Sequence, residues 1–243
     1  MTESQNHNEP IRLSPLAVAL DTSDWETFRQ WCSLFGPRVG VLKVGLEAYL
    51  RWGPDAVREA QKYGAEIFLD LKLHDIPNTV AGAVGAARRL GVRYLTVHAG
   101  GGAAMLGAAV EAAGAESDEN PVALLAVTVL THLDQPQLEQ LDLPGLASER
   151  VLRWATLAHG AGCAGIVCSA LEVAELRTEL PPPFLIVTPG IRLDSVAGED
   201  QKRVATPRAA LAGGSDLLVV GRPLTRAEKP LEALAAFGAE IRK

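Results

Sequence analysis

Hydrophobic positions along the chain follow two alternating patterns. Short apolar runs of four to eight residues recur between longer stretches in which apolar residues return every three or four positions. The short runs are almost continuously apolar, which predicts parallel strands that are buried on both faces. Eight runs have this character: Leu16–Leu20, Val39–Val44, Glu66–Leu71, Tyr94–His98, Ala123–Leu130, Gly165–Cys168, Phe184–Thr188 and Leu217–Val220.

The longer stretches predict helices that cross between these strands. Asp24 and Ser148 are expected to cap the first turns of two of them, because short polar side chains accept hydrogen bonds from free backbone N–H groups. The helices are predicted over Asp24–Phe35, Pro54–Tyr63, Thr79–Leu90, Ala147–Ala161 and Arg226–Phe237.

Eight strands that alternate with helices favour a single (β/α)8 barrel over residues 16–243, preceded by a polar tail over residues 1–15. An open, doubly wound sheet has the same local pattern and stays the alternative. The run Pro181–Pro183 directly precedes a predicted strand, so we interpret it as a stiff turn rather than a linker between domains.

Composition narrows the class of protein. With 48% hydrophobic and 21% charged residues, the chain is expected to fold around a sizeable core. With a formal net charge of −6, the chain lacks the excess of basic residues that binding to a nucleic-acid polymer uses. Its apolar runs are too short to span a membrane. Cys32, Cys163 and Cys168 lack metal-ligand spacing and no secretory signal precedes them, which predicts reduced thiols in the cytoplasm.

Polar residues follow several of the predicted strands. In a barrel, active sites are built at the carboxyl ends of the strands, so these residues are expected to gather at one mouth. The positions concerned are Asp21, Lys43, Asp70, Lys72, His98, Thr131, Arg192, Gly221 and Arg222. Neither His74 nor His98 has the spacing of a metal-ligand pair, so we expect packing or supporting roles for both and no metal site.

The segment around Asp70 has the densest charge. Asp70 and Lys72 lie two residues apart and should share one face of a strand, while Lys43 ends the preceding strand and Asp75 follows in the next loop. One interpretation is an ion-pair network that closes the barrel, since buried charges need partners. The other is chemical: carboxylates keep Lys72 protonated, and it donates a proton to a developing carbanion.

The last two strand ends predict a phosphate site. Gly221–Pro223 follows one strand and Thr188–Arg192 follows the other, and barrels frequently bind phosphate at this position. Arg192 and Arg222 offer guanidinium groups that pair with phosphate oxygens. By contrast, we interpret Gly100–Gly102 as a flexible loop outside the site.

The segment Asp70–Thr79, with sequence DLKLHDIPNT, closely resembles the catalytic signature of the orotidine 5'-monophosphate decarboxylases, in particular the compact bacterial enzymes. The resemblance extends from about Leu16 to Phe237, although Leu73 and His132 depart from the family pattern. It implies a cofactor-free homodimer of barrels that converts orotidine 5'-phosphate to UMP and carbon dioxide in the last step of pyrimidine nucleotide synthesis.

The same resemblance implies a role for each matching residue. Lys72 would be the general acid, and Lys43, Asp70 and Asp75 would complete the charged array, with Asp75 and Thr79 entering the partner's site. The substrate ligands would be Asp21, Lys43 and Thr79 at the ribose, Asp70 beside the reacting carbon, Thr131 at the pyrimidine, and Arg192, Gln201, Gly221 and Arg222 around the phosphate.

Two other functions stay open at this stage. A magnesium-dependent sugar-phosphate decarboxylase or aldolase of the same barrel type has a similar Asp-x-Lys-x-x-Asp array, but lacks the Ile76–Thr79 continuation. A barrel that binds nucleotides without catalysis is disfavoured by the intact Asp70, Lys72 and Asp75. A chelator should abolish the activity of the magnesium-dependent enzyme and leave the nucleotide decarboxylase active. A barrel that only binds nucleotides would not turn over orotidine 5'-phosphate.

Overall fold

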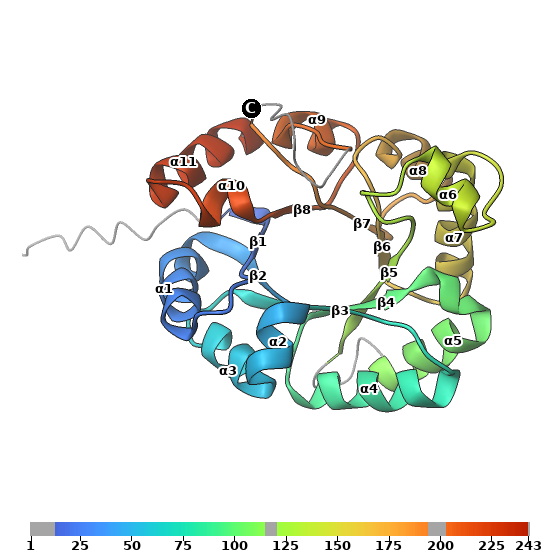
Figure 1. Ribbon diagram of the computed structural model, residues 1–243, viewed down its shortest axis with the longest axis horizontal. Coiled ribbons are helices and arrows are strands. Elements are labelled where there is room, and N and C mark those ends of the chain that lie inside the picture. Colours follow the sequence, from blue (N-terminus) through green and yellow to red (C-terminus); the bar gives the residue numbers. More distant parts are fainter. Residues whose placement is uncertain (1–12, 115–120, 194–202, 243) are drawn as a thin grey trace, which may run out of the picture.

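The computed structural model describes residues 13–114, 121–193 and 203–242, and its strands close into one parallel barrel (Figure 1). The expected (β/α)8 architecture is confirmed, and the open sheet is excluded because β1 pairs with both β2 and β8. The strands are β1 Leu13–Ala19, β2 Val39–Gly45, β3 Glu66–Leu73, β4 Tyr94–His98, β5 Ala123–Val127, β6 Gly165–Val167, β7 Leu185–Thr188 and β8 Leu217–Val220.

Helices surround this barrel on its outside (Figure 1). They cover the strand faces that point away from the barrel axis, as the apolar runs predicted. The α-helices are α1 Trp25–Phe35, α2 Leu46–Trp52, α3 Pro54–Gln61, α4 Pro77–Arg89, α5 Gly102–Ala113, α6 Gln135–Gln140, α7 Ala147–Gly160, α8 Val173–Glu179, α9 Pro207–Ala212, α10 Arg222–Thr225 and α11 Pro230–Ile241.

All eight predicted strands are present, with small shifts at their ends. β1 begins at Leu13, so the last three residues assigned to the polar tail belong to the barrel. The predicted β5 continued to Leu130, but the strand ends at Val127 and its chain continues into the barrel mouth. The proline run lies in the turn between α8 and β7, as expected.

Side chains alternate between two buried layers. Phe68 belongs to a cluster inside the barrel, whereas its neighbour Leu69 belongs to the layer between strands and helices. This alternation is the period of two expected of strands. The interior cluster fills the barrel with Ala17, Val41, Phe68, Leu125, Val187, Leu217 and Val219. The interior of the barrel below its mouth is therefore packed with side chains.

Helix starts follow cap and proline chemistry with two corrections. Asp24 caps α1 and accepts a hydrogen bond from Thr27 N at 2.7 Å, as predicted. The predicted cap at Ser148 is wrong, because α7 already begins at Ala147. The last helix does not begin at Arg226. Lys229 precedes Pro230, a position that disfavours helical backbone, so α11 begins at the proline.

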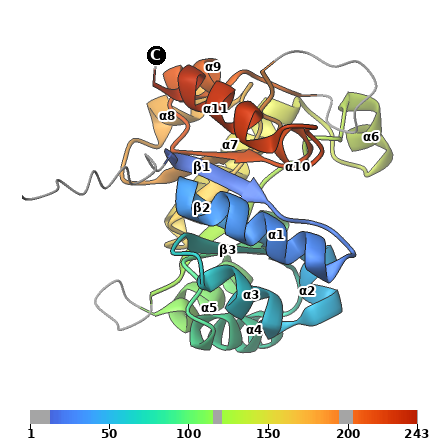
Figure 2. The ribbon, with the colours of Figure 1, turned by 90° about the vertical axis from the view of Figure 1, so that its left-hand side faces the viewer.

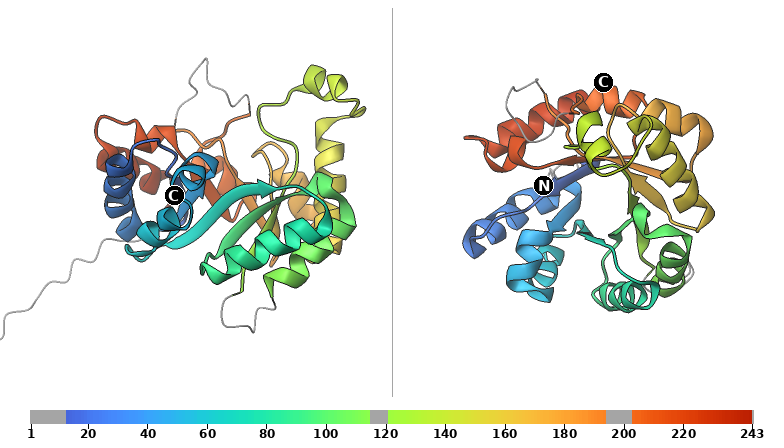
Figure 3. Two further views of the ribbon diagram at one scale, coloured as in Figure 1. Left: turned by 60° about the horizontal axis from the view of Figure 1, so that its bottom comes forward. Right: turned by 45° about the vertical axis from the view of Figure 1, so that its right-hand side comes forward.

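The segment Gly100–Gly102 is another correction. Residues 99–101 form a 3₁₀ helix and Gly102 begins α5, so the predicted flexible loop is regular structure. The two views of Figure 3 show α5 beside α4 along one flank of the barrel, where the two helices pack together. Across the described ranges, every helix is too short or too polar to cross a membrane.

The barrel mouth carries short helices that follow strand ends. Figure 2 shows α2, α6 and α10 on the same side of the molecule, beyond the ends of β2, β5 and β8 respectively. These connections place the residues after each strand around one opening. The sequence elements with the densest polar chemistry therefore converge there.

Candidate functional site

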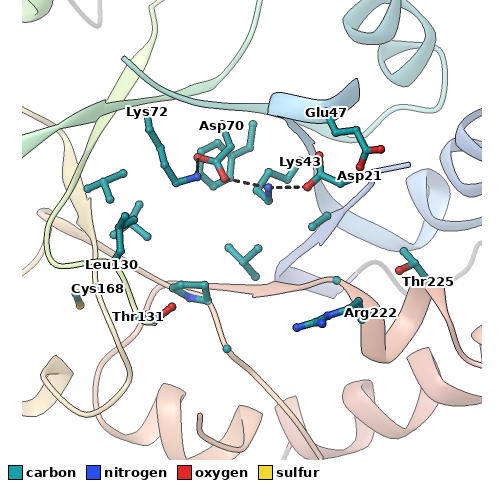
Figure 4. Close-up of a pocket in the computed structure, with 18 of the residues that line it drawn as sticks. Asp21, Lys43, Glu47, Asp70, Lys72, Leu130, Thr131, Cys168, Arg222 and Thr225 are labelled. Atoms are coloured by element: carbon teal, nitrogen blue, oxygen red, sulfur yellow. Dashed lines mark hydrogen bonds and ion pairs between the residues drawn. The ribbon is translucent and has the colours of Figure 1, made fainter. Parts of the chain in front are cut away.

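A cavity of about 520 Å³ occupies the barrel mouth (Figure 4). Its lining comes from the carboxyl ends of strands and the loops that follow them, which is the usual location of active sites in this fold. Nine of the predicted site residues are expected to act in the site of their own chain. Eight of these nine line the cavity: Asp21, Lys43, Asp70, Lys72, Thr131, Arg192, Gly221 and Arg222. The ninth, Gln201, lies outside the described residues.

Asp70 is the centre of the charged array. Its Oδ2 accepts a hydrogen bond from Lys43 Nζ at 2.9 Å, and its Oδ1 accepts one from Lys72 Nζ at 2.8 Å. Lys43 also lies 3.5 Å from Asp21, which completes a line of alternating charges along one side of the cavity (Figure 4). The paired carboxylate therefore holds both ammonium groups toward the cavity.

Burial and charge act against each other in this array. Burial alone would raise the pKa of Asp70, but Lys43 and Lys72 reverse this effect and hold the pKa well below its usual range. Burial likewise opposes the charged form of Lys43, whereas Asp70 and Asp21 raise its pKa above the ordinary value. The site thus keeps Asp70 ionised and Lys43 protonated within a poorly hydrated space.

Lys72 has a strained backbone conformation at the point where its side chain meets Asp70. Lys72 has a φ of 49°, which a residue with a side chain rarely adopts, and the pairing of β3 with β4 shifts between Leu69 and Leu73. Asp70 and Lys72 still share the cavity face, as the spacing predicted, while Leu69 and Leu71 contact the outer hydrophobic layer. A bulge rather than a regular strand produces this geometry.

Thr96 stabilises that bulge, and sequence reasoning missed it. Its fully buried hydroxyl accepts a hydrogen bond from Lys72 N at 2.8 Å and donates one to Asp70 Oδ1 at 2.9 Å. The available signal was a threonine between two apolar residues, Leu95 and Val97, in the middle of β4. Glu47 was also missed, although it lines the cavity on α2 (Figure 4).

The opposite side of the cavity carries residues that the sequence predicts to bind phosphate. Arg192 and Arg222 both line it, and Figure 4 shows Arg222 across the opening from Asp70 and Lys72. Gly190 has a φ of 79°, which explains the glycine at this turn after β7. Two guanidinium groups and two glycine backbones, the second at Gly221, therefore line the same cavity as the lysine pair.

The third wall follows β5. Val129, Leu130 and Thr131 line the cavity between the charged array and the arginine side. This wall combines apolar side chains with one hydroxyl, a composition that suits a flat heterocycle with polar edges. We call these three residues the β5 wall.

Asp75 and Thr79 do not enter the cavity of their own chain. Both side chains are exposed, and Asp75 Oδ1 accepts a hydrogen bond from Ile76 N at 2.6 Å. Among the described residues of one chain, the ion pairs of this array join Asp21, Lys43, Asp70 and Lys72.

The two histidines have the packing role expected of them. Their rings stack with a centroid distance of 5.1 Å, and His98 makes an edge contact with Trp154 at 6.2 Å. Burial lowers the pKa of His98, and His74 and Lys72 lower it further. Within the described ranges, no three His, Cys, Asp or Glu side chains form a group suited to hold a metal ion.

Comparison with known proteins gives a consistent result. The family described as "Orotidine 5'-phosphate decarboxylase / HUMPS family" matches residues 14–237. A relative named orotidine 5'-phosphate decarboxylase from Thermobifida fusca (strain YX) is 52% identical, with 95% of this chain and 97% of the relative covered. The corresponding relative from Anaeromyxobacter sp. (strain K) is 48% identical, with 93% and 97% covered.

Solved structures agree with the sequence relatives. The crystal structure of orotidine 5'-phosphate decarboxylase from Lactobacillus acidophilus matches with a TM-score of 0.80 and 36% identity, and the match covers 94% of this chain and 99% of that one. An uncharacterized conserved protein from Geobacillus kaustophilus matches with a TM-score of 0.79 and 37% identity, covering 93% and 100% of the two chains.

Proposed function

The chain belongs to the orotidine 5'-phosphate decarboxylase / HUMPS family, and from that premise we propose how its cavity decarboxylates orotidine 5'-phosphate to UMP and carbon dioxide. The reaction belongs to pyrimidine nucleotide synthesis. The observation that carries the proposal is the pairing of both Lys43 and Lys72 with Asp70, opposite Arg192 and Arg222 in one cavity. The lysines face the reacting carbon, and the arginines bind the phosphate.

Electrostatic stabilisation is the main contribution to catalysis. Loss of carbon dioxide from C6 leaves an electron pair in an orbital that the pyrimidine π-system does not delocalise. A cation about 4 Å from that charge is worth on the order of 4 kcal/mol at an effective dielectric near 20. The Lys72 ammonium supplies this cation, and the poorly hydrated surroundings of Asp70 strengthen its effect.

Lys72 then completes the reaction. The C6–carboxylate bond breaks and its electron pair stays on C6, carbon dioxide leaves, and a proton moves from Lys72 Nζ to C6. Asp70 accepts a hydrogen bond from the same nitrogen, so its main role is to position Lys72. Lys43 keeps Asp70 ionised throughout this step, because it neutralises the other carboxylate oxygen.

The rest of the nucleotide determines how the reacting carbon is placed. Arg192 and Arg222, with the backbones at Gly190 and Gly221, contact the phosphate. Asp21 and Lys43 bind ribose hydroxyls, and Thr131 faces the pyrimidine. Binding energy from the phosphate thus orients C6 toward Lys72 without taking part in bond breaking.

The chemistry of the donor set favours this reaction over magnesium-dependent sugar-phosphate chemistry. Both oxygens of Asp70 already accept hydrogen bonds from ammonium groups. A divalent cation at this position would have to displace Lys43 and Lys72, and its charge would repel them. The relatives described above also bear the name of the nucleotide enzyme.

A homodimer completes the site in this proposal. Asp75 and Thr79 are exposed in one chain and would reach the partner's cavity, where Thr79 binds the ribose and Asp75 extends the array. Large exposed apolar side chains near the same opening support an interface: Ile76 is 67% exposed, and Leu50 on α2 is 80% exposed. We place this enzyme in the cytoplasm, in keeping with its free cysteines.

Direct turnover tests the proposed function. Purified protein is mixed with orotidine 5'-phosphate in buffer containing a chelator, and the ultraviolet absorbance of the orotate ring is followed. Loss of that absorbance, with UMP as the product, is the expected result. A protein that binds the nucleotide without turnover supports a binding barrel, and activity that disappears with the chelator supports the metal-dependent alternative.

A further inference from the structure

Arg203 lies outside the cavity lining, yet it contacts the wall of the site. Its Nη2 lies 3.3 Å from the carbonyl oxygen of Val129 and 3.3 Å from that of Leu130, and donates a hydrogen bond to each. Both carbonyls belong to the β5 wall, next to Thr131. A partly buried guanidinium thus holds the backbone of the segment proposed to face the pyrimidine.

Glu172 fixes the other end of this guanidinium. It forms an ion pair with Arg203 Nη1, and the two side chains are only 7% and 14% exposed respectively. The second oxygen of Glu172 accepts a hydrogen bond from Ser169 N at 2.8 Å, in the loop after β6. The pair therefore connects the loop after β5 to the loop after β6.

The backbone just beyond Arg203 is joined to the phosphate side of the cavity. Arg192 N donates to Ala205 O at 2.9 Å, and Ala205 N donates to Gly190 O at 3.2 Å. Ile191 and Ala205 form a parallel bridge. Residues 203–205 consequently contact the β5 wall at one end and the chain that carries Arg192 at the other.

We propose that Arg203 is a positioning residue. It fixes the position of the β5 wall relative to the phosphate-binding arginines, so that the base and the phosphate of one nucleotide are bound at the same time. The inference rests on the proposed function and assigns Arg203 no contact with substrate. Because the Ala205 bridge is made by backbone atoms, it persists when the Arg203 side chain is replaced. Loss of the guanidinium then disturbs the base wall and leaves phosphate recognition largely intact.

Two ligands separate these effects. UMP contacts both ends of the cavity, whereas ribose 5-phosphate lacks the base. We expect Arg203→Met to weaken UMP binding about tenfold or more, the loss typical of a charged hydrogen bond, and to change ribose 5-phosphate binding less than about threefold. Isothermal titration calorimetry measures both affinities on the full chain.

Arg177→Met is the matched control. Arg177 also pairs with a carboxylate, that of Asp216, and donates to the carbonyls of Gly214 and Phe184, but at the opposite end of the barrel. If Arg203 were merely structural, both variants would lower the melting temperature and neither would alter ligand affinity. Arg203→Lys serves as a second variant, because it keeps the charge beside Glu172 but lacks the branched donor.

The outcomes decide between the possibilities. A selective loss of UMP affinity in Arg203→Met, or in Arg203→Lys should the methionine variant not fold, supports the inference. Unchanged UMP affinity, or equal weakening of both ligands, overturns it. Wild-type turnover of orotidine 5'-phosphate is measured in parallel, so failure of the proposed function is recognised separately from failure of this inference.

Discussion

Lys72 donates a hydrogen bond of 2.8 Å to Asp70, although the two residues are only two positions apart and Lys72 has a left-handed backbone. On a regular strand such neighbours would share a face without any requirement to pair. The bulge at Lys72 turns its ammonium group back toward the carboxylate. Local backbone strain therefore contributes directly to the arrangement of the proposed acid.

Thr96 tests the importance of this strain. Thr96→Val removes the hydroxyl that accepts from Lys72 N and donates to Asp70 Oδ1, with little change in volume. We expect kcat to fall roughly fivefold or more, because a buried hydrogen bond contributes about 1 kcal/mol and its loss misaligns Lys72. Steady-state kinetics provide the measurement. Thr96→Ser retains the hydroxyl and should keep most activity; equal losses in both variants would contradict this role.

Arg222 tests the phosphate assignment. Arg222→Ala should weaken UMP binding by about tenfold to a hundredfold, since a charged hydrogen bond contributes about 1.5–3 kcal/mol. Uridine, which lacks the phosphate, should bind equally to both proteins. Titration of each ligand checks this, with exposed Arg208→Ala as the control for lost charge. Parallel weakening of uridine would show that Arg222 supports the cavity in another way.

Mixed dimers test the shared site. Lys72→Ala and Asp75→Ala subunits should each be inactive alone, but a mixed dimer contains one site that has neither defect. Random exchange makes half of the dimers mixed, and one of their two sites is intact, so roughly a quarter of wild-type activity should return. The mixture is assayed after exchange has been confirmed with tagged subunits. Complete exchange without recovery would contradict a contribution of Asp75 across the interface.

His98 predicts a dependence of stability on pH. Burial, His74 and Lys72 lower the pKa of His98 in the folded chain below its ordinary value of 6.5. The unfolded chain therefore binds a proton at this residue first as the pH falls, so stability decreases from pH 6.5 down toward the folded pKa. Urea unfolding at pH 7.5 and 5.5 measures the decrease. His98→Asn should reduce it, and an unchanged decrease would show that other groups cause the acid effect.

Much of this fold could be predicted because its apolar runs are distinct. Buried parallel strands need near-continuous apolar residues, and β4 and β8 have the predicted bounds. The first residue of a helix was harder to predict where more than one nearby residue could be its N-cap. Ser148 has the chemistry of a cap, but Leu146 is already extended and α7 begins between them. The run Gly100–Gly102 suggested a loop, whereas packing around Ala99 and Met105 orders it into helices.

The site was predictable where chemistry lies in one short segment. The spacing of Asp70 and Lys72 placed both at the mouth, but no local pattern shows the left-handed backbone of Lys72. Thr96 and Arg203 escaped prediction because their roles depend on contacts with residues 24 or more positions away along the chain. Such contacts are set by barrel closure, which a linear pattern does not record.

Lys72→Ala tests the central claim most directly, with turnover and UMP binding measured on the same preparation. Removing the ammonium leaves Asp70 paired with Lys43, so the cavity should still bind UMP within about tenfold of wild type. Turnover of orotidine 5'-phosphate should fall by at least about a thousandfold, since both the stabilising cation and the proton donor are lost. Lys229→Ala, on the surface, should behave as wild type. Turnover by Lys72→Ala within tenfold of wild type would contradict the account.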